Sequence, residues 1–399
     1  MNLKSGLVKE LTINNKPSTI NRKHFVFSID IEDWFQVENL KEVISPDEWD
    51  SKELRVEQNT EKVLDILDRH EVQATFFVLG WIAERCPDLV KKIAAHGHEI
   101  ASHGYGHELL HKMSREEIRE DFEKALEIIQ PLAENTITGY RSPSFSITDT
   151  AADVLKELGF KYDASFNKFQ FNERYGAVSF ADETAMAASL PRSDADTSGK
   201  GQESGDKSDG DPKGSELGDK SDGVDGSGFI VEGRDDQPTT NNQPKTKNQK
   251  PTTAHVRLAN GLIEFPVTVN TYFGIHWPLG GGYFRLSPMW FLRKQLSDSL
   301  RSAQSMADGS GFMAEKQNSA TNNQQPTTNN YKPTTINLYL HPWEFDPDQP
   351  RVSGLSFKNR FRHYYGLKHT SGKFEKFVEM VKSRETIEIT TFGGLSVTG

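Results

Sequence analysis

The chain has 399 residues, of which 35% are hydrophobic, and its formal net charge at pH 7 is −10. This length accommodates one large domain or two ordinary ones, and the acidic balance argues against nucleic acid as a partner. The single cysteine, Cys86, excludes an intrachain disulfide, and the sequence contains no apolar run of the roughly 18 residues that a membrane span requires. Residues 1–23 contain no apolar core of signal-peptide length, so we expect a cytoplasmic protein.

Strand and helix patterns alternate along the first part of the chain. Apolar runs predict strands at 24–31, 74–79, 99–102, 137–140 and 160–163, and later at 261–267, 336–340 and 386–391. Helical spacing predicts helices at 59–70, 87–96, 114–130 and 148–158, and later at 287–300 and 373–381. This order is typical of right-handed βαβ units, so we predict an α/β fold with a mostly parallel sheet.

Two low-complexity blocks interrupt the alternation, at about 182–254 and 303–335. Gly-Asp-Lys-Ser-Asp-Gly occurs twice in the first block, and Gln-Pro-Thr-Thr-Asn-Asn occurs once in each block. Such segments cannot bury enough apolar surface to offset their ordering entropy, so we expect disordered insertions. The sequence therefore predicts a tail at 1–23 and one folded domain built from 24–181, 255–302 and 336–399, the last part carrying His341.

Polar side chains follow several of the predicted strands. Asp30, Glu32 and Asp33 end the first strand, and His103 follows the third. The carboxyl ends of parallel strands are where α/β folds place their functional groups. His103 and His107 are four residues apart, so they share one face if the chain turns into a helix there.

Two histidines and one carboxylate form a three-ligand set with an open position, which is the catalytic form of a zinc site. Such a metal activates water and polarises a carbonyl group. A remaining carboxylate can act as the base, a fixed Arg141 can hold that base ionised, and His341 can protonate the leaving group. These groups are the components of metal-assisted hydrolysis of an amide or ester.

Six segments of this chain resemble polysaccharide deacetylases of the NodB-homology class, carbohydrate esterase family four. More closely, they resemble the subgroup found with exopolysaccharide biosynthesis and exosortase loci. The segments are 27–35, 74–78, 97–107, 139–143, 280–285 and 338–344. The likeness covers about 24–181, 255–300 and 336–392, which is most of the chain that we expect to be ordered.

The resemblance implies a distorted (β/α) barrel that removes N- or O-acetyl groups from a sugar polymer. Matched by position, Asp30 is the base, Arg141 tethers it and His341 is the general acid. His103 and His107 are metal ligands, and the metal that the resemblance implies is a divalent ion, zinc above others.

The carboxylate ligand is the place where the sequence departs from the family pattern. Many members have two adjacent aspartates, whereas here Asp30 is followed by Ile31, Glu32 and Asp33. Glu32 lies on the same strand face as Asp30, and this alternation favours it. Asp33 takes the role if the strand has already turned, so both remain candidates.

The remaining site candidates are substrate contacts. Pro143 of the Arg-x-Pro motif, Tyr105 and Trp343 are the residues that we assign to the substrate, although aromatic side chains more often belong to a core. Asp163 is either a partner of the site or a turn residue. Glu344 is expected to form an ion pair.

The leading hypothesis is a metal-dependent hydrolase of carbon–nitrogen bonds other than peptide bonds. Its substrate would be an acetylated amino-sugar polysaccharide or the biosynthetic precursor of one. A small-amide hydrolase similar to allantoinase is the second hypothesis, and a closed pocket would favour it over an open groove. A non-catalytic glycan-binding protein with the same fold is the third, and it need not hold a stoichiometric metal.

Overall fold

The computed structural model describes residues 23–167, 175–181, 256–307 and 335–396. The tail predicted at 1–23 and the insertions predicted at 182–254 and 303–335 lie, apart from their edges, outside the described residues. The predicted domain boundaries therefore stay predictions. Across the ranges that the structure describes, no helix has both the length and the apolar character needed to cross a bilayer.

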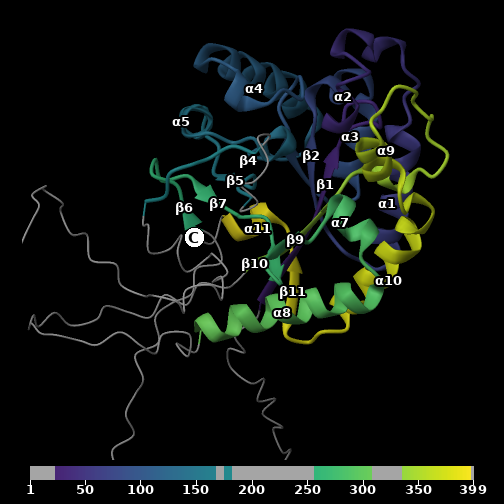
Figure 1. Ribbon diagram of the computed structural model, residues 1–399. Helices are drawn as coiled ribbons and strands as arrows, with labels where there is room; N and C mark the ends of the chain where they lie inside the picture. The colour runs from purple at the N-terminus through teal and green to yellow at the C-terminus, as the bar shows by residue number, and fades with distance from the viewer. Residues whose placement is uncertain (1–22, 168–174, 182–255, 308–334, 397–399) are drawn as a thin grey trace, which may run out of the picture. The chain divides into compact units, whose positions relative to one another are not determined.

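One mostly parallel sheet is the centre of the described fold (Figure 1). Its strand order is β10-β1-β2-β3-β4-β5-β7-β6, and β11 pairs with the start of β1. Only β6 runs antiparallel to its neighbour, and β8 and β9 form a separate antiparallel hairpin. The strands are β1 (Lys23–Ile31), β2 (Thr75–Val78), β3 (Glu99–Ser102), β4 (Gly139–Tyr140), β5 (Tyr162–Asp163), β6 (Val256–Arg257), β7 (Ile263–Glu264), β8 (Val269–Tyr272), β9 (Ile275–Pro278), β10 (Thr335–Leu340) and β11 (Ile387–Thr390).

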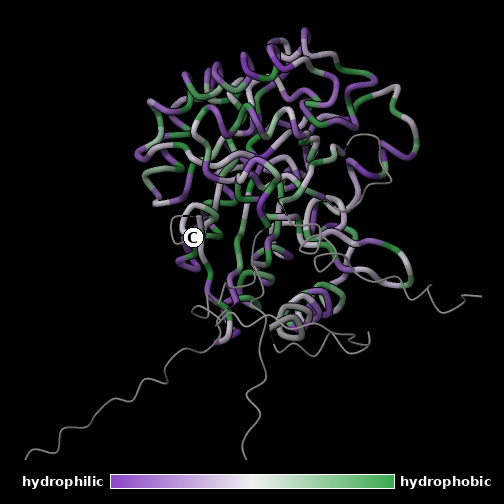
Figure 2. Tube along the Cα trace, turned by 90° about the vertical axis from the view of Figure 1, so that its left-hand side faces the viewer, coloured by the Kyte–Doolittle hydropathy of each residue, from purple (hydrophilic) through white to green (hydrophobic). Residues whose placement is uncertain are grey.

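Helices connect the parallel strands, which confirms the predicted α/β fold. In Figure 2 the helical turns alternate between hydrophobic and hydrophilic residues, as expected for helices that pack one face against a core. The helices are α1 (Val56–Arg69), α2 (Gly80–Arg85), α3 (Pro87–Ala95), α4 (Arg115–Ile129), α5 (Asp149–Glu157), α7 (Gly281–Leu286), α8 (Met289–Ala307), α9 (Phe357–Tyr364), α10 (Thr370–Lys382) and α11 (Phe392–Ser396).

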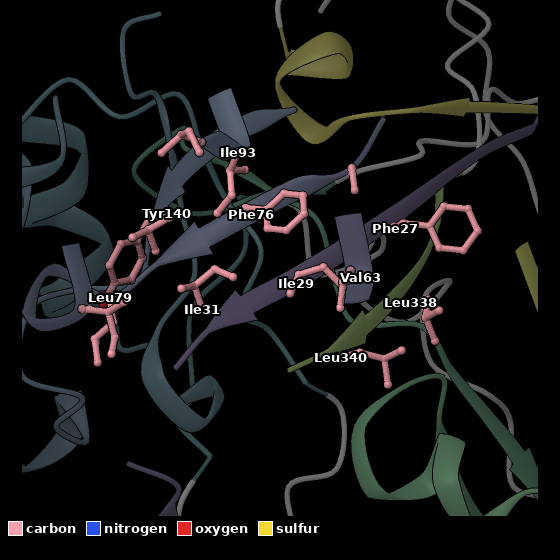
Figure 3. Packing of buried hydrophobic residues seen from close by; sticks show 14 of the residues in the cluster. Phe27, Ile29, Ile31, Val63, Phe76, Leu79, Ile93, Tyr140, Leu338 and Leu340 are labelled. Carbon is pink, nitrogen blue, oxygen red and sulfur yellow. The ribbon is translucent and has the colours of Figure 1, made fainter. Parts of the chain in front are cut away.

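Strand β1 separates the core from the site by the alternation of its side chains. Phe27, Ile29 and Ile31 belong to the large core between the sheet and the helices, where Val63 of α1 also packs (Figure 3). The residues between them, including Asp30, therefore point to the opposite, inner face of the sheet. This alternation places the carboxylate on the inner face.

The sheet curls around that inner face, and helix α11 fills part of it. The ring of Phe392 lies 6.0 Å from the ring of Phe77, 5.7 Å from Tyr162 and 5.0 Å from Phe265. Strands β2 and β7 are four steps apart in the sheet, which in a flat sheet is roughly 19 Å. One ring can touch both only because the sheet is strongly curved, which agrees with the predicted distorted barrel.

The largest differences from the predicted elements lie in the second half of the chain. Residues 280–285, which precede the helix predicted at 287–300, mostly belong to a helix of their own, α7. Hairpin β8–β9 and helix α9 were not predicted. In α9 only His363 is buried, and its two phenylalanines, Phe357 and Phe361, have helical spacing but stand in a mostly polar stretch that is too short to reveal a helix.

Candidate metal and catalytic site

A buried ion pair joins Asp30 of β1 to Arg141, the residue that follows β4. The Arg141 guanidinium donates to Asp30 Oδ1 at 2.7 Å and to Ser28 Oγ at 2.8 Å, and its Nε donates to the carbonyl oxygen of Ala164 at 3.0 Å. The arginine side chain is fully buried and lies over the Phe77 ring at 4.1 Å. The structure therefore brings together the predicted base and its tether, and a buried bond of this kind fixes both side chains.

The histidine pair lies in a loop after β3, so the helix that would place both on one face does not form there. Within this loop Gly104 has φ +73° and His107 has φ +54°, both outside the right-handed helical region. The two carboxylate oxygens of Asp121 in α4 accept from the backbone N–H groups of Tyr105 and Gly106, at 2.9 Å each. This bridge from α4 holds the loop in the conformation that brings the imidazoles together, with ring centroids 5.6 Å apart.

Glu32 lies between two histidines. Its Oε2 is 3.1 Å from His107 Nε2, and its Oε1 is 3.1 Å from His341 Nε2. Burial by itself raises the pKa of the Glu32 carboxyl, but the charges of His107 and His341 outweigh burial and lower that pKa to about 2. Glu32 is therefore an ionised, buried carboxylate that can serve as a ligand.

Glu32, His103 and His107 form a cluster that can hold a metal ion. Their ligand atoms all lie within 4.8 Å of one another, and all three residues are buried. His103 Nδ1 is 2.8 Å from the carbonyl oxygen of Arg141, which leaves Nε2 as the ligand atom. Burial lowers the pKa of His103 to about 4, so this imidazole is neutral, as a ligand must be. Two imidazoles and a carboxylate are a donor set that fits a zinc-class ion.

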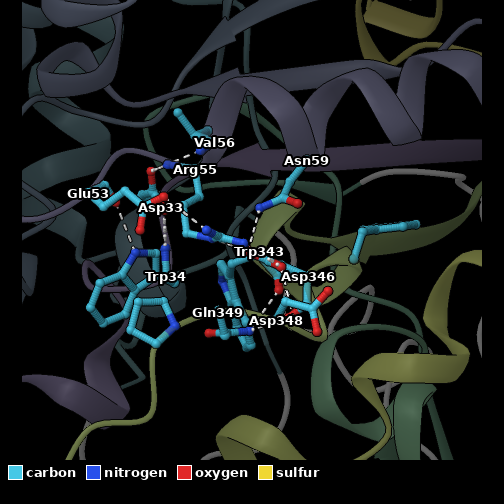
Figure 4. A network of polar contacts seen from close by, with 12 residues as sticks. Asp33, Trp34, Glu53, Arg55, Val56, Asn59, Trp343, Asp346, Asp348 and Gln349 are labelled. Carbon is cyan, nitrogen blue, oxygen red and sulfur yellow. Dashed lines mark hydrogen bonds and ion pairs between the residues drawn. The ribbon is translucent and has the colours of Figure 1, made fainter.

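Asp33, the alternative carboxylate ligand, has a different role (Figure 4). Its Oδ2 accepts from the backbone N–H groups of Arg55 and Val56, at 2.7 and 2.9 Å, and its Oδ1 accepts from Trp34 N–H at 2.7 Å. Asp33 therefore satisfies free amide groups at the start of α1 and is directed away from the histidine pair. Of the two candidates, only Glu32 joins the cluster.

His341 follows β10 and is held by a buried pair of charges. Its Nδ1 lies 3.0 Å from Glu344 Oε2, and the other oxygen of Glu344 accepts from Arg285 Nε at 2.7 Å. Nε2 of His341 faces Asp30 Oδ2 at 3.8 Å. Burial lowers the pKa of His341, but the neighbouring carboxylates of Glu32, Glu344 and Asp30 together raise it to about 9.

Asp30, His341 and the cluster of Glu32, His103 and His107 converge on a cavity of about 500 Å³. Asp30, Glu32, His103, His107 and His341 line its inner end. Other parts of the wall are aromatic or glycine-rich, and they come from Phe145, Tyr175, Gly281, Gly282, Tyr283 and Tyr339. The glycine-rich segment therefore lines the cavity.

Only one of the three predicted substrate contacts lines this cavity. Trp343 does, but it is 5% exposed and stacks between the rings of His341 and His363. Tyr105 lies outside the cavity, with its hydroxyl donating to Glu84 and its ring under Lys124. Pro143 is buried and begins a short 3-10 helix, so its neighbours Ser144 and Phe145 face the cavity instead.

Asp163 is a buried partner of the site and is not a turn residue. It neighbours Glu264 across β5 and β7, and the Asp163 carboxylate accepts from Ser165 Oγ at 2.5 Å. Burial and the negative charge of Asp163 raise the pKa of Glu264 well above its usual range, so Glu264 is the protonated member of this pair. Arg141 is close enough to favour the charged form of both carboxyls.

Sequence reasoning missed three supporting residues. Asp121 is an ordinary acidic residue of an amphipathic helix in the sequence, and Arg285 precedes the helix predicted at 287–300. Glu344 was predicted to form an ion pair, which it does, but not to contact His341. The spacing did contain a signal for this contact. Glu344 stands three residues after His341 at the start of a short 3-10 helix, and residues at this spacing can form a capping box.

Comparisons with known proteins agree with this geometry. Residues 47–162 match the family described as polysaccharide deacetylase, and residues 237–308 and 306–390 match a domain of unknown function, DUF3473. A peptidoglycan-N-acetylglucosamine deacetylase of Bacillus cereus is 34% identical over 134 residues, which are 30% of this chain and 49% of that protein. A peptidoglycan deacetylase of Helicobacter pylori is 29% identical over 134 residues, which are 34% of this chain and 46% of that protein.

Among solved structures, a CE4 family pseudoenzyme from Bacillus anthracis is similar at 20% identity and a TM-score of 0.29, covering 36% of this chain and 43% of that one. The chain spans about half the length of the two curated relatives above. The family match covers the helices and strands from α1 to β5, including His103, His107 and Arg141. The chain therefore carries a polysaccharide deacetylase domain over residues 47–162.

Proposed function

We propose that this protein is a metal-dependent hydrolase that removes acetyl groups from an amino-sugar polysaccharide or its biosynthetic precursor. The observation that carries the proposal is the convergence of Asp30, His341 and the cluster of Glu32, His103 and His107 on one cavity. The relatives named as peptidoglycan deacetylases support the same reaction class. That the metal is zinc, that the polymer is an exopolysaccharide and that the protein works in the cytoplasm stay predictions from the sequence.

Asp30 acts as the general base in this proposal. Its Oδ1 is occupied by Arg141, so Oδ2 is the oxygen that can take a proton from the attacking water. Arg141 is also held by Ser28 Oγ, which accepts from the same nitrogen as Asp30, and by the Ala164 carbonyl oxygen, which accepts from Nε. The arginine therefore orients the base.

His341 acts as the general acid. Its Nδ1 is engaged by Glu344, so Nε2 carries the proton that is directed into the cavity. Protonation of the nitrogen or oxygen that leaves the acetyl carbon allows that bond to break. Asp30 and His341 come from neighbouring strands, β1 and β10, which fixes their separation.

Glu32, His103 and His107 would hold the metal in this proposal. When bound, the metal supplies Lewis acidity next to the acetyl group. The three protein ligands leave an open position, which a catalytic site requires and a structural site does not.

An acetylated glycan fits the cavity better than a small amide. Phe357, which lines the cavity, is 86% exposed, so the cavity opens to solvent on that side. A closed pocket, which would favour a small-amide hydrolase, is not what the lining residues form. A polymer can enter such an opening and place one sugar at the inner end.

Release of acetate tests the proposal directly. We expect the purified full chain to release acetate from an acetylated chitooligosaccharide, to lose this activity on chelation and to regain it when zinc is added back. No release by a protein that holds stoichiometric zinc would contradict hydrolysis of this substrate. Absence of both release and metal would favour the glycan-binding alternative.

Replacing Glu344 with glutamine is expected to lower kcat about tenfold or more while KM changes little. The amide cannot offer the negative charge that holds both His341 and Arg285, so the imidazole loses its orientation. Steady-state acetate release measures the effect, and a thermal unfolding curve shows whether the variant is folded. A variant whose KM rises while kcat stays unchanged would argue that Glu344 has no part in orienting the acid.

A further inference from the structure

Helix α9 presents an aromatic stripe at the edge of the cavity. Phe357 and Phe361 are four residues apart on one side of the helix, and the ring of Tyr365, which follows the helix, lies 4.8 Å from the ring of Phe361. All three line the cavity, and they are 86%, 44% and 48% exposed. Large aromatic side chains gathered in this way on a protein surface mark a place where a ligand binds.

A strongly basic segment surrounds this stripe. Residues 349–374 contain six lysines and arginines and no aspartate or glutamate, in a chain whose net charge is −10. Lys358 and Arg362, one position after Phe357 and Phe361, also line the cavity. Within the described residues, neither side chain forms an ion pair or a hydrogen bond. We call Lys358 and Arg362 the basic rim.

The basic rim is not needed to hold the helix in place. Arg285 anchors α9 instead, because it donates to the carbonyl oxygens of Arg362, His363 and Tyr365 at 2.7 to 2.9 Å. The ring of His363 stacks on Trp343 at a centroid distance of 4.7 Å, which ties the helix to the catalytic region. The side chains of the basic rim are therefore free to contact a ligand.

We propose that the substrate is an anionic glycan, in which sugars that carry a carboxylate adjoin the acetylated amino sugar. The basic rim binds the carboxylate, and the aromatic stripe packs against the faces of the sugar rings. Lysine and arginine without partners are complementary to a carboxylate, and arginine matches its geometry. This inference rests on the proposed deacetylase function and names its substrate class.

The position of these side chains favours a glycan over an anionic membrane surface. They line the same cavity as Asp30 and His103, so their ligand reaches into the cavity and does not lie flat on the surface. Glu38 is an acidic group on the cavity wall, and Lys41 lies 3.4 Å from it and 3.3 Å from Glu108. Lys358 and Arg362 form no ion pair with Glu38 in the part of the chain that the structure describes, so the rim stays basic.

The test uses an oligosaccharide of alternating N-acetylglucosamine and glucuronate, and the same oligosaccharide after reduction of its carboxyl groups. Binding is measured by titration calorimetry with the zinc-loaded Asp30→Asn variant of the full chain. The ratio kcat/KM for acetate release is measured with the chain that retains Asp30. We expect the anionic form to bind about tenfold more tightly than the reduced form, a preference that weakens as salt is added.

Arg362→Gln is expected to abolish this preference, and Lys358→Gln to reduce it. Arg360→Gln is the matched control, because Arg360 is an exposed residue of the same helix that does not line the cavity. Equal affinity for the two oligosaccharides, or an equal loss in Arg360→Gln, would overturn the proposal. Binding to phosphatidylglycerol vesicles that needs the basic rim, without a preference between the sugars, would assign the rim to a membrane instead.

The same data separate this inference from the proposed function. A preference for the anionic oligosaccharide without acetate release from any glycan would support the anionic subsite and reject deacetylation. Acetate release from chitooligosaccharide with no preference for charge would support deacetylation and reject the anionic subsite.

Discussion

Asp30→Asn is expected to reduce kcat for acetate release by roughly 10²- to 10⁴-fold, the range that a positioned general base contributes. The amide keeps the size of the carboxylate but cannot accept a proton from water. Arg141 then faces a neutral partner in a fully buried position. The effect should appear in kcat with metal content unchanged, because Asp30 does not belong to the ligand cluster. Acetate release at saturating substrate, together with metal analysis, measures it.

Ser28→Ala provides the matched control for Asp30→Asn. It removes another acceptor of the same Arg141 nitrogen, at 2.8 Å, and leaves the carboxylate in place. We expect Ser28→Ala to retain most of the activity. If the two variants lost activity equally, the orientation of Arg141 would matter more than the proton acceptor, and Asp30 would not be the base.

Glu32→Gln is expected to lower zinc affinity by at least about 100-fold, whereas Asp33→Asn should leave it unchanged. Loss of a group that merely supports a ligand costs about 10- to 100-fold in affinity, so loss of a ligand should cost at least as much. Asp33 instead accepts from the backbone amides of Arg55 and Val56. Its replacement is expected to reduce the free energy of unfolding by about 1–3 kcal/mol, because the amide group places a donor against these donors.

Metal titration and denaturant unfolding of the two variants form one comparison. The expected pattern is reciprocal, since Glu32→Gln loses metal and Asp33→Asn loses stability. If Asp33→Asn lost zinc while remaining fully folded, Asp33 and Glu32 would exchange roles when metal binds. Zinc retained by Glu32→Gln would remove Glu32 from the ligand set.

The positions of the main site residues followed from the sequence because they depend on strand ends. Asp30, Arg141 and His341 each follow an apolar run, and parallel strands bring their carboxyl ends to one edge. The choice between Glu32 and Asp33 did not follow, because the alternation of side chains stops where the strand stops. The role of Asp33 is set by the backbone amide groups of Arg55 and Val56, which lie more than twenty residues further along the chain.

Other features depend on contacts that leave no periodic pattern. Helix α9 is fixed by hydrogen bonds from Arg285 to its carbonyl oxygens, and backbone acceptors are the same in every sequence. Asp121 supports the histidine loop, but in the sequence it looks like any acidic residue of an amphipathic helix. The four-residue spacing of His103 and His107 also suits a helix, but a loop held by Asp121 brings the two rings together instead.

The pairing of β1 sets an order for biosynthesis. One edge of this strand pairs with β10 along residues 24–29, and the start of its other edge pairs with β11. Both partners lie more than 300 residues further along the chain, so as the chain leaves the ribosome β1 can pair with β2 along residues 28–31 but waits for β10 along its other edge. Such distant pairing slows folding and exposes an apolar strand to other chains. His341 arrives with β10, so the pairing that covers this edge of β1 also brings the acid to the base.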